Sequence, residues 1–151
     1  MRKQPGIATT PNGTLTILSI SPVEEDHKCL QEIIGHSNWI LLKADRVPPA
    51  LAFLQQQQIS VVLCEHDLQP EAWIDILDST KHHRNPPCLI VTSRLADDRL
   101  WAEALNLGAW DVLSKPFDRN EVLHSVAGAG VHWYHQLQMP ATKMKVMKAA
   151  S

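Results

Sequence analysis

The chain has 151 residues and a formal net charge of −2, with 44% hydrophobic and 20% charged residues. This composition is typical of a globular protein of one domain, and the charge balance excludes the basic surface of a nucleic-acid-binding domain. No apolar run reaches the length of about 18 residues that would predict a membrane span, and the basic first residues lack the apolar core of a secretory signal.

The first half of the chain alternates between apolar runs and helical patterns. Residues 1–13 are polar, hold two prolines and two glycines, and are predicted to form a flexible arm. The apolar run 15–20 predicts a strand, and Ser21-Pro22-Val23-Glu24 after it reads as a capping box that starts a helix ending at Gly35. Residues 39–42 predict a second strand, and two prolines at 48 and 49 then open a second helix.

The second half repeats this alternation. Residues 59–64 form the most continuous apolar run and predict a strand buried on both faces. A helix around Trp73 follows, then a strand over 88–92, a helix over 97–107 with Trp101, Ala104 and Leu105 facing inward, and a strand over 110–113. A capping pattern from Asp118 opens the last helix, and residues 138–151 are predicted to form a frayed tail.

Strands that alternate with helices predict a parallel sheet with helices on both faces. Ligands of such sheets bind beyond the carboxyl ends of the strands. The polar residues predicted at that edge are Ser21 and Pro22, the run Glu65-His66-Asp67, Thr92 with Ser93, and Lys115 with Pro116.

One segment carries a specific resemblance. Residues 108–117, GAWDVLSKPF, are similar to the G-A-x-D-x-L-x-K-P-F stretch of the receiver domains of two-component response regulators, with Lys115 as the pocket lysine. Thr92 stands where that family places its phosphate-binding hydroxyl. The resemblance covers roughly residues 14–133 of a domain predicted over 14–137. It implies a flavodoxin-like (CheY-like) doubly wound sheet of five parallel strands in the order 2-1-3-4-5, with a cis peptide bond at Lys115-Pro116.

The chain departs from the family pattern at three places in the phosphorylation pocket. The acidic pair that binds Mg²⁺ in a working receiver is replaced by Ser21 and Pro22, which offer no carboxylate. The acceptor position falls on Glu65, which we expect to pair with Lys115, and the switch aromatic is replaced by Val112. We therefore expect a degenerate receiver that is not phosphorylated and holds no metal or other cofactor.

Two alternative functions remain open. The first is a working phosphoacceptor receiver that uses Asp67 or Glu65 with Mg²⁺ and improvised metal ligands. The second is a sensor that binds a small ligand at the carboxyl ends of the strands. Glu24, Glu25 and Asp26 could supply a metal ligand, but their place in the first helix favours a solvated face.

Enzymatic and metal sites have little support. The sequence contains no GxGxxG, no phosphate-binding P-loop motif and no GxSxG, so we expect no enzyme. His132 and His135 share a helical face without a third ligand, which does not predict a metal site. The cysteines Cys29, Cys64 and Cys88 form no CxxC pair, which favours reduced thiols and a cytoplasmic location.

A non-phosphorylated receiver must act through a surface that is always competent to bind. No output domain follows the last predicted helix, so we expect the partner to be a separate signalling protein, such as a histidine kinase or an output protein. In receivers the usual partner surface is formed by the fourth helix, fifth strand and fifth helix, here 97–137, and a homodimer through it is a further expectation. Trp110 and Val112 are predicted at this surface, whereas Trp101 and Trp133 are predicted in the core.

Overall fold

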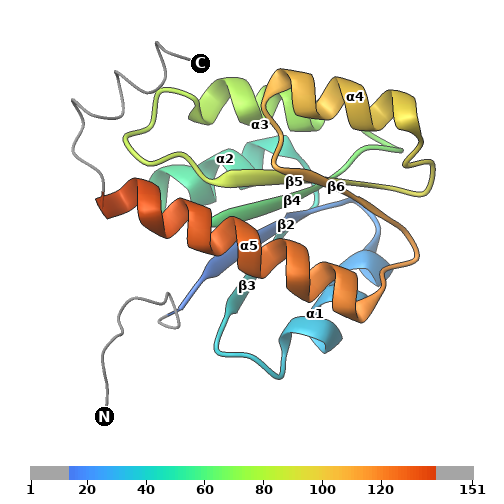
Figure 1. Ribbon diagram of the computed structural model, residues 1–151, viewed down its shortest axis with the longest axis horizontal. Helices are drawn as coiled ribbons and strands as arrows, with labels where there is room; N and C mark the ends of the chain where they lie inside the picture. Colours follow the sequence, from blue (N-terminus) through green and yellow to red (C-terminus); the bar gives the residue numbers. More distant parts are fainter. Residues whose placement is uncertain (1–13, 139–151) are drawn as a thin grey trace.

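The computed structural model describes residues 14–138 (Figure 1). The predicted arm, residues 1–13, lies outside the described residues, and so does the predicted tail apart from Gln138. Gln138 belongs to the last helix rather than to the tail to which we assigned it. No helix among the described residues has the length and apolarity needed to cross a membrane.

Five parallel strands and five helices alternate along this part of the chain. The strand order in the sheet is β3-β2-β4-β5-β6. If the five strands are numbered 1 to 5 along the chain, this is the predicted order 2-1-3-4-5. Every neighbouring pair of strands is parallel, so the predicted fold class is confirmed. The strands are β2 (Thr16–Ile20), β3 (Ile40–Ala44), β4 (Val61–Glu65), β5 (Cys88–Ser93) and β6 (Asp111–Ser114), and the helices are α1 (Glu24–Ile34), α2 (Val47–Gln56), α3 (Ala72–Thr80), α4 (Asp98–Leu107) and α5 (Arg119–Gln138).

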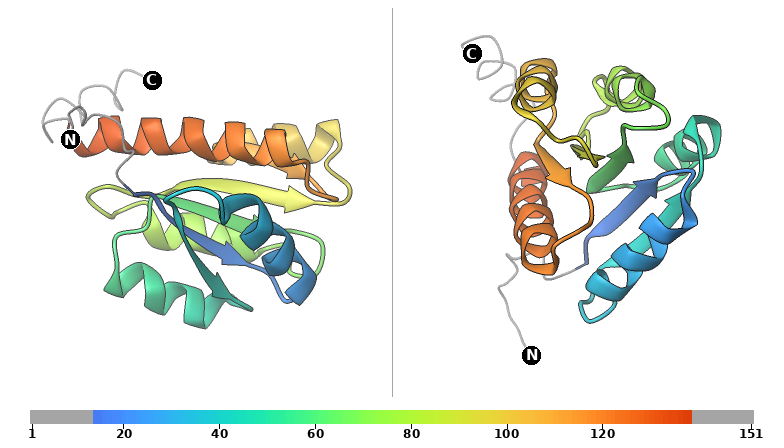
Figure 2. Two further views of the ribbon diagram at one scale, coloured as in Figure 1. Left: turned by 90° about the horizontal axis from the view of Figure 1, so that it is seen from below. Right: turned by 90° about the vertical axis from the view of Figure 1, so that its right-hand side faces the viewer.

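The sheet lies between two layers of helices, as the end-on view in Figure 2 shows. Helices α1 and α5 pack on one face, and α2, α3 and α4 pack on the other. Successive residues of a strand point to opposite faces of the sheet, and each face has its own hydrophobic core. In β4, Val62 and Cys64 belong to the core under α2, α3 and α4, whereas Val61 and Leu63 belong to the core under α1 and α5. Burial on both faces explains why the central strands read as continuous apolar runs.

Helix ends follow the predicted turn chemistry in the second half of the chain. The Asp97 carboxylate accepts a hydrogen bond from the Leu100 amide at 2.9 Å and caps α4. The Asp118 carboxylate does the same for the Glu121 amide at the start of α5. Gly108 ends α4 with a φ of +111°, a left-handed conformation that favours glycine. The predicted cis bond at Lys115-Pro116 is present.

The predicted capping box at the start of α1 is wrong. The helix begins at Glu24, and Val23 precedes it without a side-chain cap. The Ser21 hydroxyl accepts a hydrogen bond from the Val23 amide at 3.0 Å, which forms a tight turn before the helix. The same hydroxyl donates a hydrogen bond to the Asp26 carboxylate in the first turn of α1.

Several predictions about large side chains are corrected. Trp133 is buried as predicted, but Trp101 is 42% exposed and Leu105 40% exposed. Leu100 and Ala104, one turn apart, are the residues of α4 that face the core, so their chain neighbours Trp101 and Leu105 point outward.

The thiols are free, as predicted from their spacing. Burial raises the pKa of Cys64 and of Cys88 to about 12. Burial and the carboxylates around it also raise the pKa of Cys29. All three therefore remain protonated and weakly nucleophilic at neutral pH.

Candidate functional site

The predicted pocket residues come together at the carboxyl edge of the sheet. Ser21 directly follows β2, Glu65 is the last residue of β4, and Lys115 directly follows β6. Thr92, in β5, stands opposite Glu65 in the parallel register. The folding of four separate strands to one edge therefore places a lysine, a carboxylate and two hydroxyls in one pocket.

The Lys115 ammonium group binds two carboxylates. Its Nζ atom lies 2.9 Å from Asp26 Oδ2 and 3.5 Å from Glu65 Oε1. The side chains of Lys115, Asp26 and Glu65 are only 6%, 12% and 1% exposed, so water contributes little to screening their charges. The predicted contact between Lys115 and Glu65 is present, but the shorter ion pair is with Asp26.

Our prediction that Asp26 lies on a solvated face is wrong. Asp26 is buried, whereas Glu24 and Glu25 in the same first turn of α1 are exposed. Its Oδ2 atom also accepts a hydrogen bond of 2.7 Å from the Ser21 hydroxyl. Asp26 thus supplies from α1 the carboxylate that the end of β2 lacks.

A histidine fixes the start of α1 against the end of β2. His27 is buried, and its Nε2 atom donates a hydrogen bond to the Ser21 carbonyl at 2.9 Å. Its Nδ1 atom shares a hydrogen bond of 3.0 Å with the Ser19 hydroxyl. Since Ser19 and Ser21 belong to β2 and the turn after it, these contacts hold Asp26, one residue before His27, in reach of Lys115.

Glu65 is held by the loop that follows it. Both of its carboxylate oxygens accept from the Leu68 amide, at 3.1 and 3.0 Å. Together with the Lys115 contact, this leaves a buried carboxylate that is paired with a cation and whose oxygens already have donors. Glu65 is therefore a structural member of the pocket rather than an exposed acid.

Asp67 has a different environment, outside the ion-pair cluster. It accepts hydrogen bonds from the Ser93 hydroxyl and, at 2.8 Å, from the Arg94 amide. The Ser93 hydroxyl in turn accepts from the Leu95 amide at 2.9 Å. Asp67 thus joins the loop after β4 to the loop after β5. Sequence analysis placed Ser93 at this edge but did not foresee this bond.

The pKa of the Asp67 carboxyl is lowered. Partial burial alone would raise it, but the hydrogen bonds from Arg94 and Ser93, with the Lys115 charge and His66 as smaller contributions, outweigh burial. A lowered pKa in the folded state means that ionised Asp67 stabilises the fold above the ordinary aspartate pKa of about 3.9 and ceases to do so as the pH falls through the folded-state value.

Replacing Asp67 by asparagine should therefore lower the free energy of unfolding at pH 7, by an amount of the order of 1 kcal/mol because the side chain is partly solvated. The difference from the wild type should shrink as the pH falls below about 4, which urea titrations across pH would measure. Asp45→Asn, at a solvent-exposed ion pair, is the matched control and should change little. A difference between the Asp67→Asn variant and the wild type that does not depend on pH would contradict this account.

Thr92 occupies the predicted place but makes no side-chain hydrogen bond among the described residues. It is buried, and its carbonyl accepts from the His66 amide at 2.9 Å. Its contacts are those of a strand residue, and its role as a phosphate-binding hydroxyl stays a prediction.

The residues present do not fit the Mg²⁺ ion that the family pattern implies. Ser21 and Pro22 stand in place of the two carboxylates, and the Ser21 hydroxyl is bonded to Asp26. The carboxylates that are present, Asp26 and Glu65, already share the Lys115 ammonium group. Across residues 14–138, no three His, Cys, Asp or Glu side chains gather as metal ligands would. A cation at the centre of this pocket would have to displace Lys115.

Of the two residues predicted at the partner surface, one is exposed and one is buried. Trp110 is 38% exposed, and its ring packs on that of His132 with centroids 4.9 Å apart. Val112 is only 6% exposed and belongs to the core cluster that contains Leu100 and Ala104 of α4. The prediction that Val112 lies at the surface is therefore wrong, because α4 covers this face of the edge strand β6.

Comparison with known proteins places this geometry in context. The model of the response regulator receiver domain family matches residues 23–127. The chain resembles the signal receiver domain of an HD domain-containing protein from Pseudomonas fluorescens Pf-5, at 22% identity and a TM-score of 0.74 over 83% of this chain and 93% of that one. It also resembles a response regulator from Thermotoga maritima, at 19% identity and a TM-score of 0.71 over 78% and 98% of the two chains. Among curated protein sequences, none matches.

The structural neighbours share the fold, and the family match extends over more than half of the chain, including α1, the β4 edge with Glu65 and the β6 edge with Lys115. The five-stranded order, the lysine after the last strand and the cis bond that follows it agree with that match. The chain belongs to the response regulator receiver domain family.

Proposed function

We propose that this chain is a receiver domain that is not switched by phosphorylation and that acts by binding another protein. Receiver domains are in general signalling modules rather than enzymes, and they interact with kinases and output domains. The observation that carries the proposal is the buried group of Lys115, Asp26 and Glu65, in which the lysine of the family pocket is already ion-paired with two carboxylates.

Phosphoryl transfer to a carboxylate needs a nucleophile that can reach the donor and a cation that neutralises the charge of the transferred group. Glu65 is almost fully buried and bonded to Leu68 and Lys115. Asp67 is more accessible, but both of its oxygens accept hydrogen bonds, from the last residue of β5 and from the residue after it. The acidic pair that binds Mg²⁺ beside the acceptor in a working receiver is replaced here by Ser21 and Pro22. We therefore propose that neither carboxylate is a phosphoacceptor.

Incubation with acetyl phosphate and Mg²⁺ should leave the intact mass of the protein unchanged. A receiver that carries the acidic pair and an aspartate acceptor is the positive control and should gain one phosphoryl group under the same conditions. A gain by the wild-type chain that is lost in Asp67→Asn or Glu65→Gln would overturn the proposal, and would identify the acceptor.

The surface proposed for protein binding is formed by α4, β6 and α5. Its exposed large apolar residues are Trp101, Leu105, Leu107, Trp110, Val131 and Leu137. Figure 1 shows α4 and α5 on either side of β6, so these residues lie on neighbouring elements. Aromatic side chains are enriched among the residues that dominate binding energy, since they bury a large area with few rotatable bonds. We propose that this surface binds a separate signalling protein or a second copy of the chain.

A further inference from the structure

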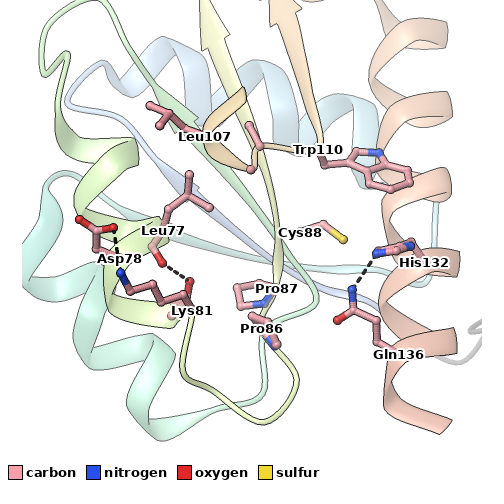
Figure 3. Close-up of a pocket in the computed structure, with 13 residues that line it drawn as sticks. Leu77, Asp78, Lys81, Pro86, Pro87, Cys88, Leu107, Trp110, His132 and Gln136 are labelled. Carbon is pink, nitrogen blue, oxygen red and sulfur yellow. Dashed lines mark hydrogen bonds and ion pairs between the residues drawn. The ribbon is translucent and has the colours of Figure 1, made fainter. Parts of the chain in front are cut away.

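A groove of about 420 Å³ lies at the opposite end of the sheet from the Lys115 pocket. It opens where β5 and β6 begin, between the end of α3, the end of α4 and the second half of α5 (Figure 3). None of the ion-paired pocket residues lines it. The groove is therefore a separate feature of the molecule, and its volume is within the range of sites for small molecules.

Most of the groove wall is apolar. Leu77 of α3, Pro86 and Pro87 of the loop before β5, and Leu107 and Trp110 flank the space in Figure 3. Leu107 is 53% exposed, and Trp110 presents an indole ring on the opposite wall. A flat apolar group placed here would remove both side chains from water, which is the main favourable contribution to binding of this kind.

The wall at α5 is held in place. The His132 ring packs on Trp110, and the Gln136 amide donates a hydrogen bond of 2.7 Å to His132 Nε2. Because both rings are fixed by their neighbours, a ligand that packs on Trp110 would lose little affinity through ordering of the wall.

The rim of the groove carries positive charge. Lys81 lines it, and the exposed residues His82, His83 and Arg84 follow directly in the same loop. The one lining carboxylate is Asp78, whose Oδ1 atom lies 3.8 Å from Lys81 Nζ. Both side chains of this pair are more than half exposed, so the pair is weak and Lys81 can exchange it for another anion.

We propose that this groove binds a small aromatic carboxylate, with its ring between Leu107 and Trp110 and its carboxylate at Lys81. The apolar wall accounts for the ring, and the excess of basic groups at the rim accounts for the negative charge. The inference uses no residue of the Lys115 pocket and no phosphorylation chemistry, but the groove shares Leu107 and Trp110 with the surface proposed for protein binding.

The test compares 1-naphthoate with its neutral analogue 1-naphthamide, by NMR titration that follows the Trp110 indole N–H. Naphthoate should bind more tightly than naphthamide. Lys81→Met should weaken naphthoate binding about fivefold, and Asp78→Asn, which releases Lys81, should strengthen it by a similar factor. The matched control Lys28→Met, on the exposed face of α1, should leave the affinity unchanged.

A further variant tests whether the ligand contacts Leu107. Leu107→Asn alters an exposed side chain, so the fold should be retained and the NMR spectrum would verify it, while the affinity for naphthoate should fall several-fold. Equal binding of the two compounds, equal affinity of Lys81→Met and Lys28→Met, or unchanged affinity of Leu107→Asn would each overturn the proposal. Failure of naphthoate to bind the wild-type chain would overturn it as well.

Discussion

Replacing Lys115 by methionine is expected to lower the free energy of unfolding at pH 7 by about 3–5 kcal/mol. The variant keeps the length and apolar stem of the side chain but removes the ammonium group that lies 2.9 Å from Asp26 and 3.5 Å from Glu65. Two carboxylates would then be buried together without a cation, which costs both their lost attraction to Lys115 and their mutual repulsion. Chemical denaturation of the two proteins measures the difference.

A control substitution separates the loss of the buried charge from the loss of any lysine. The matched control is Lys28→Met, where the lysine is exposed on α1, and it should change the stability by less than about 0.5 kcal/mol. A loss for Lys115→Met that is as small as that of the control would show that the group is not a buried ion cluster.

Removing all three charges should restore stability. In Asp26→Asn, Glu65→Gln, Lys115→Met no buried charge remains, and replacement of a complete buried ion group by neutral side chains is often neutral for stability. The triple variant should therefore be more stable than Lys115→Met alone. This would identify the charges, and not the shape of the pocket, as the cause of the loss.

The fold could be predicted from the sequence because its signals are local and repeated. The continuous apolar run that became β4, and the similar run of β5, read as strands covered on both faces, and both faces are covered by helices. Asp97 and Gly108 marked the two ends of α4 through cap chemistry that depends only on neighbouring residues. The start of α1 was less well predicted, because the Ser21 hydroxyl serves a tertiary contact instead of a cap.

The candidate site was predicted only in part, and the missing member was Asp26. Three consecutive acids at 24–26 read as a solvated first turn, which favours the helix dipole. A signal was nevertheless present: Asp26 precedes Leu30 by four residues and Ile33 by seven, and both of these are buried. Asp26 therefore lies on the inward stripe of α1, where a charge requires a partner such as Lys115.

The misplacement of Val112 has a different cause. The family position suggested the surface, because an aromatic residue there reports the state of the pocket. In this chain the same position carries a small apolar side chain, and it packs into the core with α4. Val112 carries no aromatic ring that could move with the state of the pocket. This supports our proposal of a binding surface that does not depend on phosphorylation.

Trp110→Ala should weaken association through the α4-β6-α5 surface by about 2 kcal/mol or more, which corresponds to roughly thirtyfold in Kd. Trp110 is the one exposed aromatic residue here that is braced by a neighbouring ring, since His132 packs on it. Light scattering should show dimers of the wild type, or complexes with a captured signalling partner, that do not change with acetyl phosphate and that Trp110→Ala disrupts. Leu68→Ala, which removes an exposed apolar side chain from the loop after β4, is the matched control and should have no effect. A wild-type chain that is strictly monomeric, and whose captured partners are all retained by Trp110→Ala, would show that this surface is not the binding site.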